Sequence, residues 1–232
     1  MIYVTSDLHG YSLEKFKEML ASVNFSEKDF LYILGDVIDR GPDGIKIIKW
    51  LMSKSNAQLL LGNHEKMMLD CEFIIEEITN ESADRLTGTM LNTFSLWVSN
   101  SGGVTLEALR AIRDSEQKYI FEYLNDAPLY ETVSAGDKDF ILVHSGLGNF
   151  REDKKLSEYS KHDLVWTRPN LNTRYFDHIM TVFGHTPTVS FGEEYKGRAL
   201  KTDTWIDIDT GAGWGLNPML LRLDDMKEFY FD

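Results

Sequence analysis

Four of the six histidines in this 232-residue chain stand at the ends of short apolar runs, where strands are expected to end. Each lies within two residues of a glycine, which lets the backbone turn sharply and present the imidazole at the edge of a sheet. One histidine in such a place is more often a packing or capping residue, so the shared context of all four is what indicates a site. These histidines are His9 in SDLHG, His64 in LGNHE, His144 in ILVHSG and His185 in VFGHT.

Oxygen donors accompany these histidines. Asp7 and Asn63 each lie within two residues of a histidine, and Asp36 ends another apolar run. Crowded carboxylates raise each other's pKa, and bound cations remove that cost. Mixed oxygen and imidazole donors suit divalent Mn, Fe, Zn or Co, and the absence of thiolates favours an open site over a closed structural zinc site. Six donors suffice for two ions if one carboxylate bridges them: Asp7, His9, Asp36, Asn63, His144 and His185.

The first third of the chain alternates short apolar runs with amphipathic stretches. This β-α-β-α-β-α pattern predicts parallel strands covered by helices, and hence an α/β fold. Ligands bind beyond the carboxyl ends of such strands, so DLHG, GDVIDRG and GNHE are expected at one edge of the sheet. The three apolar runs are IYVTSD, FLYILGD and AQLLLGN.

The rest of the chain divides into two parts. Residues 76–127 lack strand alternation and are expected to form a helical insertion or cap within a single domain, 1–232. The second half returns to strand-like runs and predicts a second, more antiparallel sheet. The runs are DFILVHSG, IMTVFGHT, TWIDIDTG and MLLRL.

Composition excludes some partners. A formal net charge of -13, with no cluster of basic residues, argues against nucleic acids and anionic membranes. No apolar run reaches the roughly 20 residues of a membrane span, and the first residues do not resemble a signal peptide. The single cysteine, Cys71, is expected to be a packed thiol in a helix. A cytoplasmic location is the expectation.

The motifs DLHG, GDVIDRG, GNHE, HSG and GHT, in this order, resemble the signature of the calcineurin-like metallophosphoesterases. Within that group they resemble the phosphoprotein phosphatases, in particular the bacterial and phage serine/threonine phosphatases. The resemblance extends from Asp7 to about Gly215. It implies a four-layer α/β/β/α sandwich of two mixed sheets and two divalent metal ions, with manganese first and iron, zinc, cobalt or nickel as other candidates.

The resemblance also implies roles for individual residues. His64 would be the catalytic imidazole, oriented by Asp39, and would protonate the leaving oxygen. Arg40 would bind phosphate in a bidentate manner, with Asn63 beside it. Arg168, in LVWTRPN, matches a second phosphate-binding arginine, and the alternative is an exposed surface residue. For the metals, Asp7 and His9 would hold the first ion, Asp36 would bridge, and Asn63, His144 and His185 would complete the second.

The implied reaction is hydrolysis of a phosphomonoester through direct attack on phosphorus by a hydroxide bound to both metals. The substrate would be a phosphorylated protein or a small phosphoester. One alternative is a symmetrical diadenosine tetraphosphate hydrolase, but those enzymes usually lack the residue corresponding to Asp39 and often have aspartate in place of Glu65. Leu61 stands where the phosphatases commonly have an arginine before GNHE. This difference leaves open whether the substrate is a protein. A non-catalytic metal-binding scaffold is the remaining alternative.

Overall fold

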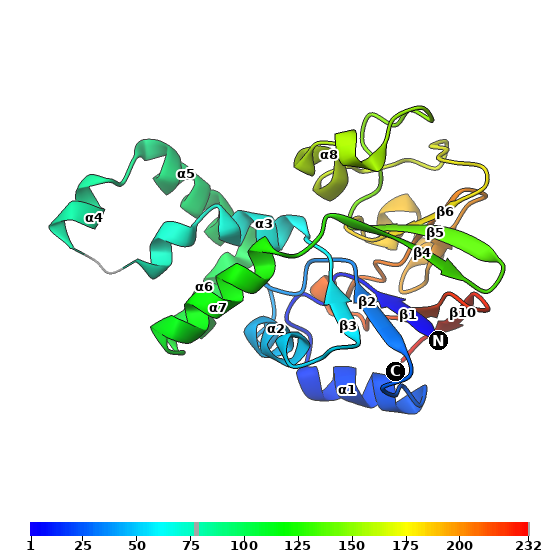
Figure 1. The fold of residues 1–232 in the computed structure, drawn as a ribbon, viewed down its shortest axis with the longest axis horizontal. Helices are drawn as coiled ribbons and strands as arrows, with labels where there is room; N and C mark the ends of the chain where they lie inside the picture. The colour runs from blue at the N-terminus through cyan, green and yellow to red at the C-terminus, as the bar shows by residue number, and fades with distance from the viewer. Residues whose placement is uncertain (77–78, 232) are drawn as a thin grey trace.

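Two five-stranded sheets form the centre of the computed structural model, which describes residues 1–76 and 79–231 (Figure 1). The first sheet has the order β10-β9-β1-β2-β3, in which β1, β2 and β3 run parallel, as predicted. Its strands are β1 (Ile2–Thr5), β2 (Phe30–Ile33), β3 (Ala57–Leu59), β9 (Leu220–Arg222) and β10 (Lys227–Phe229).

The last two strands correct one expectation. The run MLLRL was expected in the second sheet, but its strand β9 pairs antiparallel with β1 in the first. The physical reason is burial on both faces: Leu220 packs in the core under the helices, and Leu221 packs in the core between the two sheets. Consecutive apolar residues suit a strand that is covered on both sides.

The second sheet has the order β4-β5-β6-β8-β7. It is mixed rather than mainly antiparallel, because β5–β6 and β6–β8 are parallel while β4–β5 and β7–β8 are antiparallel. Its strands are β4 (Tyr130–Ala135), β5 (Lys138–Val143), β6 (Met180–Phe183), β7 (Leu200–Lys201) and β8 (Trp205–Asp207).

Three apolar layers hold the sheets and helices together. One layer packs α1 (Leu13–Ser22), α2 (Gly44–Met52) and α3 (Asn63–Leu69) against the first sheet. The second lies between the sheets, and the third packs α8 (Lys161–Val165) against the outer face of the second sheet. This confirms the predicted sandwich of two mixed sheets with helices. Short turns complete this part: η3 (Leu156–Glu158), η4 (Thr188–Phe191), η5 (Glu193–Tyr195) and η6 (Ala212–Trp214).

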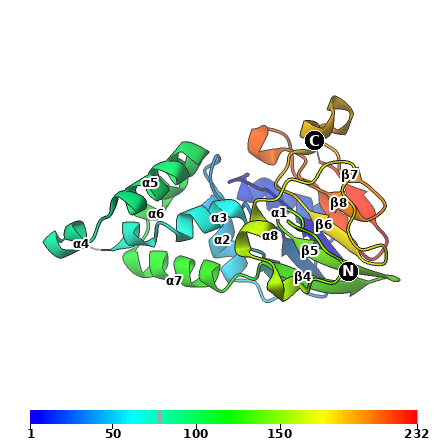
Figure 2. The same cartoon turned by 90° about the horizontal axis from the view of Figure 1, so that it is seen from above.

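A helical segment between β3 and β4 projects to one side of the sheets (Figures 1 and 2). Of the expected insertion 76–127, residues 77 and 78 lie outside the described residues. Cys71 is buried in the turn after α3 and not within a helix, because α3 ends at Leu69. No helix in the described ranges has the length and apolar character needed to cross a bilayer. The segment contains η1 (Glu72–Ile75), α4 (Asn80–Asp84), α5 (Gly88–Trp97), η2 (Val98–Gly102), α6 (Gly103–Arg110) and α7 (Asp114–Asn125).

Candidate metal centre and active site

The residues singled out from the sequence come together where β1, β2, β3, β5 and β6 end. The local backbone there is unusual: ten non-glycine residues in the described ranges have positive φ, and six of them belong to this group. Such conformations cost of order 1–3 kcal/mol each and persist where surrounding structure imposes them, often at functional sites. The six are Asp7, His9, Asp36, Asp39, Arg40 and His185.

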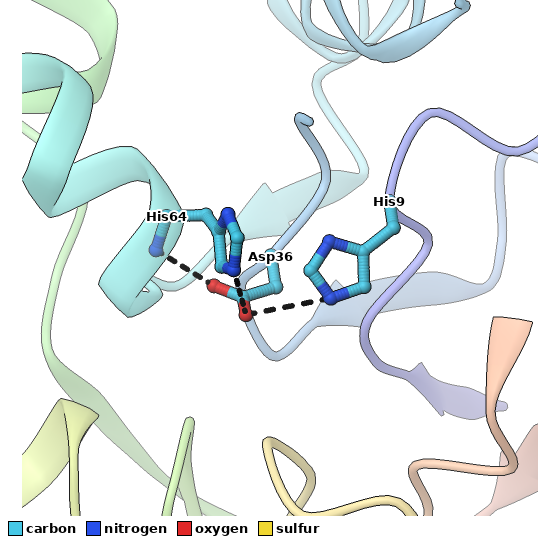
Figure 3. A group of neighbouring side chains, drawn as sticks. All are labelled: His9, Asp36 and His64. Carbon is cyan, nitrogen blue, oxygen red and sulfur yellow. Dashed lines mark hydrogen bonds and ion pairs between the residues drawn. The ribbon is translucent and has the colours of Figure 1, made fainter. Parts of the chain in front are cut away.

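Asp36 lies at the centre of the cluster (Figure 3). Its Oδ2 is 3.6 Å from His9 Nε2 and 3.9 Å from His64 Nε2, while its Oδ1 is 3.4 Å from His144 Nε2. Two triads could each hold a cation, and Asp36 belongs to both: one adds His9 and His64, the other His144 and His185. Burial opposes ionisation of Asp36, but the surrounding histidines outweigh it and lower its pKa.

Backbone carbonyls orient two of these imidazoles. His9 Nδ1 is 3.1 Å from the carbonyl oxygen of Ile38, and His144 Nδ1 is 2.6 Å from that of Leu34. A ring that donates from Nδ1 keeps Nε2 unprotonated and available as a ligand. Burial has the same effect on His9, because it lowers the pKa of this imidazole to about 3.

Several buried acceptor atoms in the cluster have no hydrogen-bond donor among the described residues. Asp7 Oδ1 and His185 Nε2 are buried and have no hydrogen-bond partner in the described structure. His144 Nε2 lies 2.9 Å from Asn63 Oδ1. Burial, and the nearby charge of Asp36, raise the pKa of Asp7 to about 6. Divalent cations would supply positive charge and satisfy these atoms, so the donor set fits a metal centre.

Glu65 holds the loop that carries Asp36. Its carboxylate accepts four backbone N–H groups: Oε2 from Asp36 and Gly62, and Oε1 from Val37 and Ile38. The sequence marks Glu65 only as the neighbour of a histidine. The structure shows that it ties the turn after β2 to the start of α3.

His64 and Asp39 form a buried pair. The His64 Nδ1 is 2.6 Å from Asp39 Oδ2, and its Nε2 faces the cluster. Burial opposes protonation of this imidazole, but the charge of Asp36 and the hydrogen bond and charge of Asp39 raise its pKa to about 9. His64 lies close enough to Asp36 to belong to a ligand triad, yet its other nitrogen is engaged by a carboxylate, which favours the imidazolium.

Arg40 and Arg168 border the same site. The Arg40 guanidinium lies over the Trp214 ring, 4.7 Å from its centroid. Arg168 Nη1 donates to the carbonyl oxygen of His185 at 3.1 Å and to Thr186 Oγ1 at 3.0 Å. Within residues 1–76 and 79–231, neither guanidinium forms an ion pair with a carboxylate. Both therefore keep their charge free for an anion.

Sequence reasoning missed other polar residues at this site. Asp207 and Asp209 are buried behind the cluster, and burial raises the pKa of both carboxyl groups well above the ordinary value. Trp97 and Thr105 come from the helical segment and donate to Asp39. Only the Asp-Thr-Gly turn that follows β8 offered a signal for Asp209, and neither Trp97 nor Thr105 stands in a recognisable motif.

Comparison with known proteins shows which family the chain belongs to. The sequence profile of the calcineurin-like phosphoesterases matches residues 1–208. A symmetrical bis(5'-nucleosyl)-tetraphosphatase of Buchnera aphidicola is 45% identical over 183 residues, which cover 73% of this chain and 60% of the relative. Serine/threonine-protein phosphatase 1 of Salmonella typhimurium is 25% identical over 229 residues, covering 96% and 91%.

Among solved structures, a protein assigned as a diadenosine tetraphosphatase shares the fold. The TM-score is 0.66 at 16% identity, and the match covers 99% of this chain and 92% of the other. At that identity the likeness concerns the fold alone.

The chain spans only 60% of the length of the Buchnera relative that it matches.

Proposed function

Since the chain belongs to the calcineurin-like phosphoesterase family, we propose that it hydrolyses phosphoric esters or anhydrides with the help of two divalent cations. One observation carries the proposal: among the residues that the structure describes, buried acceptor atoms without donors surround Asp36, and two arginines without carboxylate partners border them. Bound cations would supply Lewis acidity and lower the pKa of water at the site. The first ion would be held by Asp7, His9 and Asp36, and the second by Asp36, Asn63, His144 and His185.

The chain's own residues supply binding and proton transfer. Arg40 and Arg168, with Asn63, bind the phosphoryl oxygens and stabilise the charge that develops on them. As a water oxygen bonds to phosphorus and the bond to the leaving oxygen breaks, His64 Nε2 gives its proton to that leaving oxygen. Asp39 holds the ring in place through Nδ1. This assignment keeps His64 as an acid and not as a ligand.

The proposed substrate is a dinucleoside tetraphosphate. The Buchnera relative favours it over the phosphoprotein substrate implied by the motifs. Trp214 adds a structural reason, because it is 70% exposed while its ring lies against Arg40. A nucleobase can stack on an aromatic side chain, which contributes about 1–3 kcal/mol per base. An arginine for phosphate and an open indole for a base therefore stand side by side.

A phosphomonoester, including phosphoserine or phosphothreonine, is the second candidate. The buried pair of His64 and Asp39 favours it, because an alkoxide leaving group needs a proton. Symmetrical cleavage of a dinucleoside tetraphosphate instead releases a nucleoside diphosphate, whose phosphate oxygen leaves without one. The Salmonella phosphatase also matches this chain over nearly its full length.

A substrate panel separates the candidates. Metal-loaded protein is assayed with diadenosine tetraphosphate, a phosphothreonine peptide and p-nitrophenyl phosphate. The proposal expects the highest kcat/KM for the dinucleotide, with ADP as the product. A higher kcat/KM for the phosphopeptide would replace the first candidate with the second. Folded, metal-loaded protein that turns over none of the three would contradict the hydrolase proposal itself.

A further inference from the structure

The helical segment contributes two side chains to the buried pair of Asp39 and His64. Trp97, the last residue of α5, donates from Nε1 to Asp39 Oδ2 at 3.0 Å. Thr105, on α6, donates from Oγ1 to Asp39 Oδ1 at 2.6 Å and accepts the Asp39 backbone N–H at 2.9 Å. We propose that Trp97 and Thr105 are positioning residues that fix the Asp39 carboxylate, and through it the proton-donating ring of His64.

These contacts leave Asp39 little freedom. The carboxylate is 0% exposed, so water does not replace a lost partner. Oδ1 is engaged by Thr105, and Oδ2 is shared by Trp97 and His64 Nδ1. If one of the two outer donors is removed, the carboxylate is left with an unpaired buried lone pair and can rotate about its Cβ–Cγ bond, which turns Oδ2 away from the ring.

A local kink brings both donors to the same carboxylate. Between α5 and α6, η2 interrupts the helix with Ser101 at a φ of 72°. A Cβ at Gly102 would lie 2.5 Å from Trp97 Nε1, so only glycine fits there. The Ser101 carbonyl also accepts the backbone N–H of Arg40. Figure 2 shows α5 and α6 in the helical segment beside α3, whose second residue is the catalytic candidate His64.

A positioning role predicts an effect that depends on the leaving group. Proton donation matters for phenyl phosphate, whose leaving group is basic, and hardly matters for dinitrophenyl phosphate. If Trp97 were only a packing residue, its loss would slow both substrates alike. The inference rests on the proposed function for this readout, because it assumes that the protein hydrolyses aryl phosphates.

The test compares Trp97→Phe and Thr105→Val with two matched controls. Thr105→Ser keeps the hydroxyl, and Trp50→Phe makes the same change on α2, away from the site. We expect kcat on phenyl phosphate to fall by roughly 10- to 100-fold in Trp97→Phe and Thr105→Val, a part of what general acid catalysis contributes. On dinitrophenyl phosphate it should fall by less than about threefold, and both controls should stay near wild type on each substrate.

Equal losses on both substrates, or none, would overturn the inference. A second measurement does not need catalysis: the proton resonance of His64 Nδ1–H in metal-free protein, assigned by its absence in His64→Asn. It should shift or broaden in Thr105→Val and not in Thr105→Ser. If the resonance is unchanged in Thr105→Val as well as in Thr105→Ser, Thr105 does not position Asp39 and His64. This result would hold even if the protein proved not to be a hydrolase. If wild-type protein hydrolyses neither phosphate but the His64 resonance still shifts in Thr105→Val, only the proposed function fails.

Discussion

Replacing Glu65 with glutamine is expected to release the loop that carries Asp36. The carboxylate accepts four backbone N–H groups, two on each oxygen. Glutamine has one acceptor oxygen, so two of the N–H groups lose their acceptor and face an amide donor. Burial and the charge of Asp36 raise the pKa of Glu65 to about 7, so the carboxylate is charged only above that pH. There a hydrogen bond to a charged group contributes ~1.5–3 kcal/mol, and Glu65→Gln should reduce the free energy of unfolding by about 3–6 kcal/mol. That is a large share of the ~5–15 kcal/mol typical of a folded protein.

Urea unfolding of metal-free protein, followed by tryptophan fluorescence, measures this change without a contribution from cation binding. Glu72→Gln is the matched control, because it makes the same chemical change at a nearby residue that is exposed in η1. We expect the control to stay within about 0.5 kcal/mol of wild type, as for most surface substitutions. If Glu65→Gln costs less than about 1 kcal/mol, the account of its four charge-assisted hydrogen bonds is wrong.

Three other substitutions test separate parts of the site. His64→Asn should reduce kcat on phenyl phosphate by about 10²–10⁴-fold while metal content stays unchanged, since the ring is proposed as an acid; loss of a metal equivalent, measured by mass spectrometry, would make it a ligand. Asp36→Asn should weaken both cation sites, and an unchanged metal stoichiometry would argue against a bridge. Trp214→Ala should raise KM for diadenosine tetraphosphate by about 5- to 100-fold, from the stacking energy of a base, and should spare p-nitrophenyl phosphate; equal losses on both would mean that Trp214 only supports Arg40.

The sequence predicted best the parts of the site that follow strands. Asp7, Asp36 and Asn63 each come after a short apolar run, and parallel pairing of β1, β2 and β3 brings such ends to one edge. The local sequence pattern was therefore enough to predict that these three residues lie close together. His144 and His185 follow β5 and β6, which are also parallel neighbours.

What the sequence did not predict depends on contacts between distant residues. The placement of β9 beside β1 joins the two ends of the chain, and no turn signal announces such a pairing. Trp97 and Thr105 lie 58 and 66 residues from Asp39, in a segment without strand periodicity. Glu65 was visible as a charged neighbour of His64, but its four backbone partners depend on how two loops pack.

The central claim is that cations bound around Asp36 enable hydrolysis. The most direct test is to strip the protein of metal with a chelator, dialyse it, and titrate it with Mn²⁺ while following metal content and p-nitrophenyl phosphate hydrolysis together. The account predicts no hydrolysis by the stripped protein and full activity when two equivalents are bound. Undiminished hydrolysis by folded, metal-free protein, or none at two bound equivalents, would contradict it.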